Sequence, residues 1–238
     1  MYIPSKITSL GNAAFLGAFA LEHIILPEGL VSIGEDAFAS CASTEIIIPD
    51  SVTNLGSGAF RGCAKLEKAV VGAGITSIAS QLFINCKALK DIVINYDNIT
   101  SIGNGAFSGC ESITSVGPVG SGATVEIPDS VTALSNTFKE CHNLTNVELP
   151  NSITSIGSST FYNCSFTTIT IPASVTEIGQ EAFALCTNLT SIVYEGTMEQ
   201  WNAISKYQSS SGVMDWNYRV SVTEVVCSDG IVTLNIVQ

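Results

Sequence analysis

Cysteine is the side chain with the widest range of chemistry in this sequence, and its spacing limits what it can do. The first seven cysteines each stand three residues after a phenylalanine, and no two cysteines are closer than 22 residues. Zinc sites need paired ligands such as Cys-x-x-Cys, so this spacing argues against zinc. The pattern favours buried thiols that pack as small apolar groups, with some disulfide or a metal site as alternatives. The cysteines are Cys41, Cys63, Cys86, Cys110, Cys141, Cys164, Cys186 and Cys227.

Other groups that catalyse reactions in proteins are sparse or far apart. The only two histidines, His23 and His142, lie in no motif with a serine, cysteine or carboxylate that would make a catalytic pair. The segments 56–58 and 103–105 are glycine-rich like phosphate loops but lack the third glycine of G-x-G-x-x-G. The sequence therefore predicts no catalytic residue, no metal, no cofactor and no enzymatic activity.

A repeat positions these residues. Phenylalanine returns at intervals of 23, 22, 23, 24, 31, 23 and 22 residues, at Phe15, Phe38, Phe60, Phe83, Phe107, Phe138, Phe161 and Phe183. A period in this range is typical of a solenoid, in which each coil buries its apolar face against its neighbours. We expect eight coils over residues 1–193 as one body.

One coil, residues 89–110, shows the expected elements. Residues 89–94 have the pattern L-x-x-I-x-I, which predicts a parallel strand with Ile92 and Ile94 pointing inward. Residues 99–103 predict a second short strand, and residues 104–110 a single helical or 3₁₀ turn that buries Ala, Phe and Cys. We also predict a positive φ at the glycine after the short strand. This glycine occurs at Gly11, Gly34, Gly56, Gly103, Gly157 and Gly179.

Two stretches depart from the repeat. The 31-residue interval contains eight extra residues, 117–124, which predict a surface loop or a functional loop over the concave rim. Residues 194–238 lose the period and predict a C-terminal α+β cap, with a short helix that begins at a capping box and a β-hairpin around residues 228–230. The cap holds both tryptophans, Trp201 and Trp216, which would either close the last coil or form an exposed glycan-binding platform.

Composition limits the partners. The chain has nine Lys and Arg against 21 Asp and Glu, a net charge of −12, so nucleic acid and anionic membrane surfaces are improbable partners. No apolar run approaches the roughly 20 residues that span a bilayer. The chain opens at Met1–Pro4 inside a repeat with no leader and no polar cap, which predicts a fragment of a longer protein and allows end-to-end oligomers through the first coil.

The side chains that point outward from the concave strand are the predicted partner-binding site. The central outward position is apolar in the first four coils, at Ile25, Ile47, Val70 and Val93. The outward position two residues earlier carries His23, Glu45, Lys68 and Asp91. An exposed apolar line of this kind favours a protein-contact surface, although β-branched residues also occur in strands through propensity alone.

Residues 48–63 and 149–157 resemble the BspA-like (Treponema pallidum-type) leucine-rich repeats, and the resemblance covers about residues 1–193. It implies an α/β-type leucine-rich repeat solenoid of eight coils, with a parallel concave β-sheet, short opposite strands, 3₁₀ or helical turns and the C-terminal α+β cap. It also implies a surface or secreted protein of a host-associated bacterium. The expected function is a non-enzymatic protein-binding or adhesion module that contacts a host matrix or surface protein through the concave sheet. A structural spacer that presents another domain, and glycan binding by the tryptophans, are the alternatives.

Overall fold

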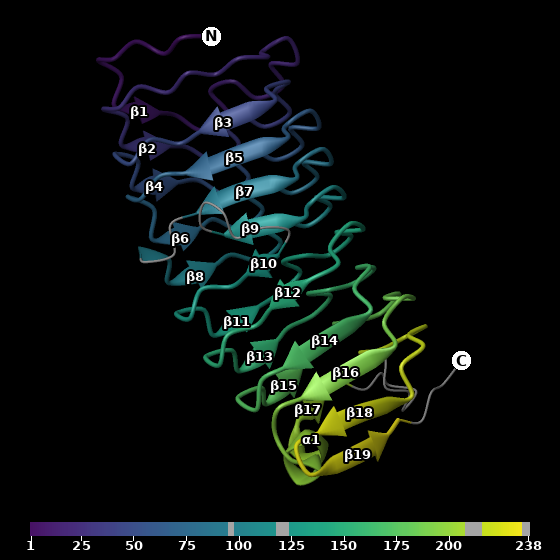
Figure 1. Ribbon diagram of the computed structural model, residues 1–238. Helices are drawn as coiled ribbons and strands as arrows, with labels where there is room; N and C mark the ends of the chain where they lie inside the picture. Colours follow the sequence, from purple (N-terminus) through teal and green to yellow (C-terminus); the bar gives the residue numbers. More distant parts are fainter. Residues whose placement is uncertain (95–97, 118–123, 208–215, 235–238) are drawn as a thin grey trace.

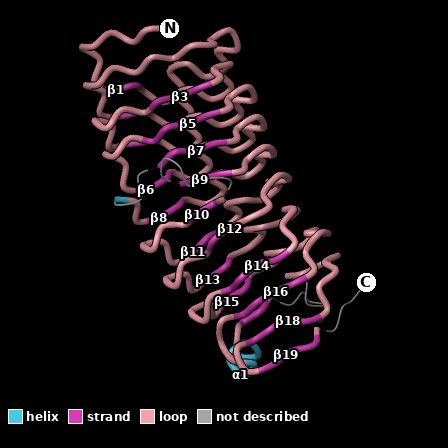
Figure 2. Tube along the Cα trace, in the orientation of Figure 1, coloured by secondary structure: helices cyan, strands magenta, loops and turns pink. Residues whose placement is uncertain are grey.

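The computed structural model describes residues 1–94, 98–117, 124–207 and 216–234. In these residues the chain winds into a parallel β-solenoid of about eight turns, as Figure 1 shows. Figure 2 shows how little of the described chain is helical; its one α-helix is α1 (Met198–Ala203). The repeat solenoid predicted from the phenylalanine period is confirmed.

One side of the solenoid is a sheet of longer strands, here called the long-strand sheet. Its strands pair in parallel and in register, so that equivalent positions of successive coils form straight columns. The first block contains β3 (Glu45–Ile47), β5 (Lys68–Val71), β7 (Asp91–Ile94), β9 (Ser115–Gly117), β10 (Val125–Glu126) and β12 (Val147–Glu148). The second block contains β14 (Thr168–Ile171), β16 (Ser191–Tyr194), β18 (Glu224–Cys227) and, antiparallel to β18, β19 (Gly230–Thr233).

The opposite side is a series of two-residue strands, here called the short-strand sheet. It is divided into three groups. The groups are β1 (Ser9–Leu10), β2 (Ser32–Ile33) and β4 (Asn54–Leu55); β6 (Ser77–Ile78) and β8 (Ser101–Ile102); and β11 (Ala133–Leu134), β13 (Ser155–Ile156), β15 (Glu177–Ile178) and β17 (Ser205–Lys206).

The predicted helical or 3₁₀ turn around each phenylalanine is wrong. These segments are successive tight turns in which the residues two before and two after the phenylalanine have positive φ, as at Asp36 (54°) and Ser40 (61°) around Phe38. The alternating backbone lets N–H groups bond the next coil: Phe38 N–H donates to the Ala59 carbonyl (2.8 Å) and Ser40 N–H to the Arg61 carbonyl (2.8 Å). Hydrogen bonds between coils replace those that a helix would make within itself.

The phenylalanines stack into a column through the core. Ring centroids of successive members lie 5.2–6.2 Å apart and all seven pairs are stacked. Phe15 in the first coil is half-buried, and the other seven are buried. Such offset contacts add about 0.5–1.5 kcal/mol per pair beyond the burial of apolar area.

The cysteines form a second column. Each of the first seven donates its thiol proton to the carbonyl of the phenylalanine one coil earlier, over distances from 2.9 Å (Cys186 to Phe161) to 3.5 Å (Cys41 to Phe15). All eight cysteines are unpaired and buried, so the predicted buried thiols are confirmed and the disulfide alternative is wrong. Removal from water raises the pKa of the Cys186 thiol to about 12.

The predicted positive φ at the glycine after each short strand is also wrong, because none of these six glycines adopts it. All but Gly11 of the first coil are required because the coils approach too closely for a side chain. A Cβ on Gly56 would lie 2.2 Å from the Glu35 nitrogen, and one on Gly103 2.4 Å from the Ser80 nitrogen. Within residues 1–193, alanine or serine replaces this glycine only at Ala79 and Ser135. The two interruptions of the short-strand sheet, between β4 and β6 and between β8 and β11, occur at these coils.

The coil between Phe107 and Phe138 contributes two long strands, β9 and β10. Val116 of β9 pairs with Val125 of β10, and β10 pairs in turn with β12. The strand pattern therefore stops and resumes where the sequence predicts; residues 118–123 of the expected loop lie outside the described residues. The phenylalanine column continues here with a centroid distance of 5.6 Å.

After residue 194 the chain extends both sheets, since β17 pairs with β15 and β18 with β16. The helix α1 begins at the predicted capping box: Thr197 Oγ1 accepts from the Gln200 N–H (3.2 Å) and Gln200 Oε1 from the Thr197 N–H (2.8 Å). The predicted hairpin is β18–β19.

Both tryptophans of this segment are buried. Trp216 meets the Phe183 ring edge-on at 6.1 Å, and Trp201 meets Trp216 at 6.0 Å. Because both rings lie at 1% exposure or less, the alternative of an exposed glycan-binding platform is wrong.

Candidate functional site

The four apolar residues predicted to contact a partner lie along one column of the long-strand sheet. Ile47, Val70 and Val93 are register partners on β3, β5 and β7. Ile25 precedes them and shares a surface hollow with Ile47. Ile25 and Ile47 are each 57% exposed, and the two valines are half-buried. We call these four residues the apolar stripe.

Two adjoining hollows follow the apolar stripe. One of about 550 Å³ is lined by Ile25 and Ile47, and the next, of about 490 Å³, by Ile47, Val70 and Val93. The hollows share Glu28, Ile47 and Pro49, so they adjoin, and we call the pair the trough. A concave apolar floor can exclude water from the side chains of a bound protein.

The four flanking residues predicted from the sequence are all exposed beside the apolar stripe. Glu45, Lys68 and Asp91 are register partners, and Lys68 Nζ lies 3.2 Å from Glu45 Oε1. Asp91 Oδ1 accepts a hydrogen bond from the Ser115 hydroxyl (2.8 Å). His23 lines the first hollow. An exposed ion pair of this kind contributes about 1 kcal/mol or less, so its main effect on the site is to neutralise Lys68.

Sequence reasoning missed the acidic rim of the trough. Glu28 and Asp50 each follow the proline that ends a long strand, and both line the hollows. The signal was available, because the residue after this proline is also acidic at Asp129.

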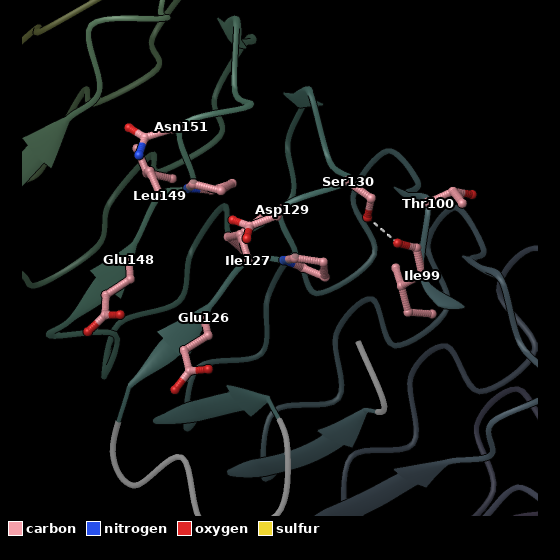
Figure 3. Close-up of a pocket in the computed structure, with 11 residues that line it drawn as sticks. Ile99, Thr100, Glu126, Ile127, Asp129, Ser130, Glu148, Leu149 and Asn151 are labelled. Atoms are coloured by element: carbon pink, nitrogen blue, oxygen red, sulfur yellow. Dashed lines mark hydrogen bonds between the residues drawn. The ribbon is translucent and has the colours of Figure 1, made fainter. Parts of the chain in front are cut away.

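A third hollow, of about 660 Å³, lies farther along the same sheet and is here called the acidic hollow. Its carboxylates are Glu126, Asp129 and Glu148, and Thr100 and Asn151 add polar groups. Glu126 and Glu148 are register partners on β10 and β12, and their side chains point to the same side in Figure 3. At the far wall the Ser130 hydroxyl donates to the Ile99 carbonyl, across the interruption between β8 and β11 (Figure 3).

The side chains that could catalyse a reaction are not brought together. His23 lies on the long-strand sheet, whereas His142 Nε2 bonds Glu140 Oε2 (2.8 Å) and Asn163 Nδ2 (3.0 Å) in the turns beyond Cys141. Among the described residues, no group of three or more His, Cys, Asp or Glu side chains is placed to hold a metal ion. No helix in the described part of the chain is long and apolar enough to cross a lipid bilayer.

Stacked parallel coils with register columns, a phenylalanine core and a trough across the long strands define a leucine-rich repeat protein of the solenoid class. The model of the BspA-type leucine-rich repeat region matches residues 1–115 and 121–223 in six copies. The chain therefore belongs to the BspA-type leucine-rich repeat family. The match extends beyond residue 193, where the resemblance seen in the sequence ended.

Solved structures of bacterial leucine-rich repeat proteins have the same fold. A leucine-rich repeat protein from Bacteroides ovatus is 27% identical, with a TM-score of 0.62 over 95% of this chain and 54% of that one. A leucine-rich cell surface protein from Faecalibacterium prausnitzii is 27% identical, with a TM-score of 0.57 over 86% of this chain and 62% of that one. The T. pallidum leucine-rich repeat protein is 26% identical, with a TM-score of 0.60 over 79% and 77%.

This chain thus spans between half and two thirds of the length of the first two of these structures. Comparison with curated proteins gave no match. The family match consists of repeats and includes no catalytic domain.

Proposed function

We propose that this protein is a non-enzymatic binding or adhesion module that contacts another protein through the apolar stripe. The observation that supports this most directly is the trough, whose two adjoining hollows are lined by Ile25, Ile47, Val70 and Val93. Most repeated polar groups are used between coils; the hydroxyls of Ser51, Ser152 and Ser174, for example, donate to carbonyls one coil earlier. The outward side chains of the long-strand sheet can therefore contact a partner, and an exposed apolar patch of this kind is typical of a protein-binding surface.

Within this proposal, residues 1–193 are the repeat solenoid and residues 194–238 its C-terminal α+β cap. The burial of Trp216 against Phe183, and of Trp201 against Trp216, supports the cap, because a solenoid end must be shielded from water. We place the protein at the cell surface or outside the cell. A structural relative from Faecalibacterium prausnitzii that is named a cell surface protein supports this location.

The test is direct binding to a panel of purified host extracellular-matrix proteins, measured by biolayer interferometry. Burial of each exposed isoleucine is worth about 1.5–3 kcal/mol, so we expect the double variant Ile25→Ser/Ile47→Ser to bind at least about tenfold more weakly. Val31→Ser is the matched control, since Val31 is 46% exposed beside the short-strand sheet. Binding that the stripe variant leaves intact, or no binding to any member of the panel, would contradict the proposal.

A structural spacer is the second candidate, because the structural relatives from Bacteroides ovatus and Faecalibacterium prausnitzii are longer than this chain. It predicts the opposite result: substitutions in the apolar stripe leave every binding activity unchanged.

A further inference from the structure

The outward column of the long-strand sheet changes character along its length. It is apolar from Ile25 to Val93, reaches Gly117 as the register partner of Val93, and then becomes acidic at Glu126 and Glu148. One face thus presents an apolar part and then an acidic part of two glutamates; the column of the second block continues with Thr170, Val193 and Val226.

The charge of the side chains that line the three hollows is one-sided. Six carboxylates and no lysine or arginine are among the described residues that line the three hollows. The carboxylates are Glu28, Glu45, Asp50, Glu126, Asp129 and Glu148. Lys68, beside the apolar stripe, lies 3.2 Å from Glu45. With a net charge of −12, the chain repels acidic partners and attracts basic ones.

The spacing of the rungs sets the length of a matching ligand. Neighbouring strands lie about 4.8 Å apart, so the apolar stripe spans three steps, or about 14 Å, and Glu126 lies two steps, or about 10 Å, beyond Val93. An extended chain advances about 3.3 Å per residue. About five residues would cover the apolar stripe, and a cation about three residues farther along would reach the acidic hollow.

We infer that the partner is an extended, basic-and-apolar protein segment, with apolar side chains over the stripe and Lys or Arg over the acidic hollow. This inference rests on the proposed function and adds the chemical class of its partner. The apolar stripe supplies the affinity by excluding water. The acidic hollow selects for cations and fixes which end of the segment lies over β10 and β12.

The experiment uses a fluorescent synthetic peptide with alternating valine and serine, followed by two lysines after a three-residue spacing. Anisotropy is measured at low salt, where charge attraction is least screened. We expect saturable binding that is about three- to tenfold weaker for the Lys→Gln peptide, because each exposed charge pair is worth up to about 1 kcal/mol. The variant Glu126→Gln/Glu148→Gln should bind the lysine peptide as weakly as it binds the glutamine peptide.

The control variant Glu35→Gln/Glu199→Gln makes the same change in net charge away from this face and should bind like the original protein. Asp129→Asn is a second test of the acidic hollow if the double variant folds poorly by circular dichroism.

The outcomes separate the two proposals. If both peptides bind equally and Ile25→Ser/Ile47→Ser weakens both, the stripe function stands and the cationic inference is overturned. Absence of peptide binding at millimolar concentration also overturns the inference, while the binding panel tests the stripe independently.

Discussion

The cysteine of each coil combines three properties that few residues share. It is small enough for the buried column that it forms, apolar enough for the core, and able to donate a proton to a carbonyl. The bond from Cys186 to the Phe161 carbonyl, at 2.9 Å, satisfies a second lone pair on an oxygen that already accepts from the Cys164 N–H. These thiols therefore hold coils together rather than perform chemistry.

The buried thiol makes the free energy of unfolding sensitive to alkaline pH. Burial raises the pKa of Cys186 from its ordinary 9.0 to about 12, so above pH 9 the unfolded chain loses this proton while the folded chain keeps it. Its contribution is complete below pH 9 and is lost as the pH rises toward 12. Urea unfolding should show Cys186→Ala to be less stable by about 1–2 kcal/mol at pH 7, through the lost hydrogen bond. The deficit should shrink or reverse between pH 9 and 12, and a constant deficit would contradict this account.

At the scale of elements, the sequence predicts the strands, the capping box and the hairpin, because these depend on local pattern. It does not predict the turns around phenylalanine. There the positive φ falls on ordinary residues such as Asp36, Glu181 and Leu185, and hydrogen bonds between coils impose it. The repeated glycine suggests a turn when seen alone. Only the adjacent coil reveals that a Cβ has no room.

The glycine that follows each short strand allows a direct test of the close approach between coils. A Cβ on Gly103 would lie 2.4 Å from the Ser80 nitrogen, whereas one on Gly11 in the first coil would meet nothing within 4 Å. We expect Gly103→Ala to lower the free energy of unfolding by about 1–3 kcal/mol, as overpacking does. Gly11→Ala should change it by about 0.5 kcal/mol or less. Equal effects in urea unfolding would show that close approach is not the reason for the glycine.

At the scale of the whole molecule, the two ends of the described solenoid differ. The C-terminal end covers Phe183 with Trp216, but the first coil leaves Phe19 75% exposed and Leu16 50% exposed. Self-association through the first coil, expected from the sequence, stays a prediction that this exposure supports.

Sedimentation at increasing protein concentration tests that prediction. We expect concentration-dependent dimers that Leu16→Asp/Phe19→Asp abolishes, because burying these side chains would be worth about 1.5–3 kcal/mol each. Val31→Asp serves as the control for added charge. A protein that sediments as a monomer at every concentration would refute the association.

The candidate site, too, could be predicted from the sequence only in part. The period of two in a strand places Ile47, Val70 and Val93 on one face, so the apolar stripe could be predicted. The trough could not, because its lining also includes Glu28, Pro49 and Asp50, which the period of two does not place. The acidic hollow also brings Glu126 and Glu148 together with Thr100 and Asn151, which no local pattern links to them.

The interruption between β8 and β11 has a mechanical consequence. In a repeat array each coil is stabilised by its nearest neighbours, so an interface with fewer hydrogen bonds is a boundary at which the array can unfold in two parts. The phenylalanine column crosses this boundary, but the hydrogen bonds of the short-strand sheet do not. A ligand that lies from Val93 to Glu126 would contact both parts, and its binding free energy would make the unfolding of the whole solenoid more cooperative.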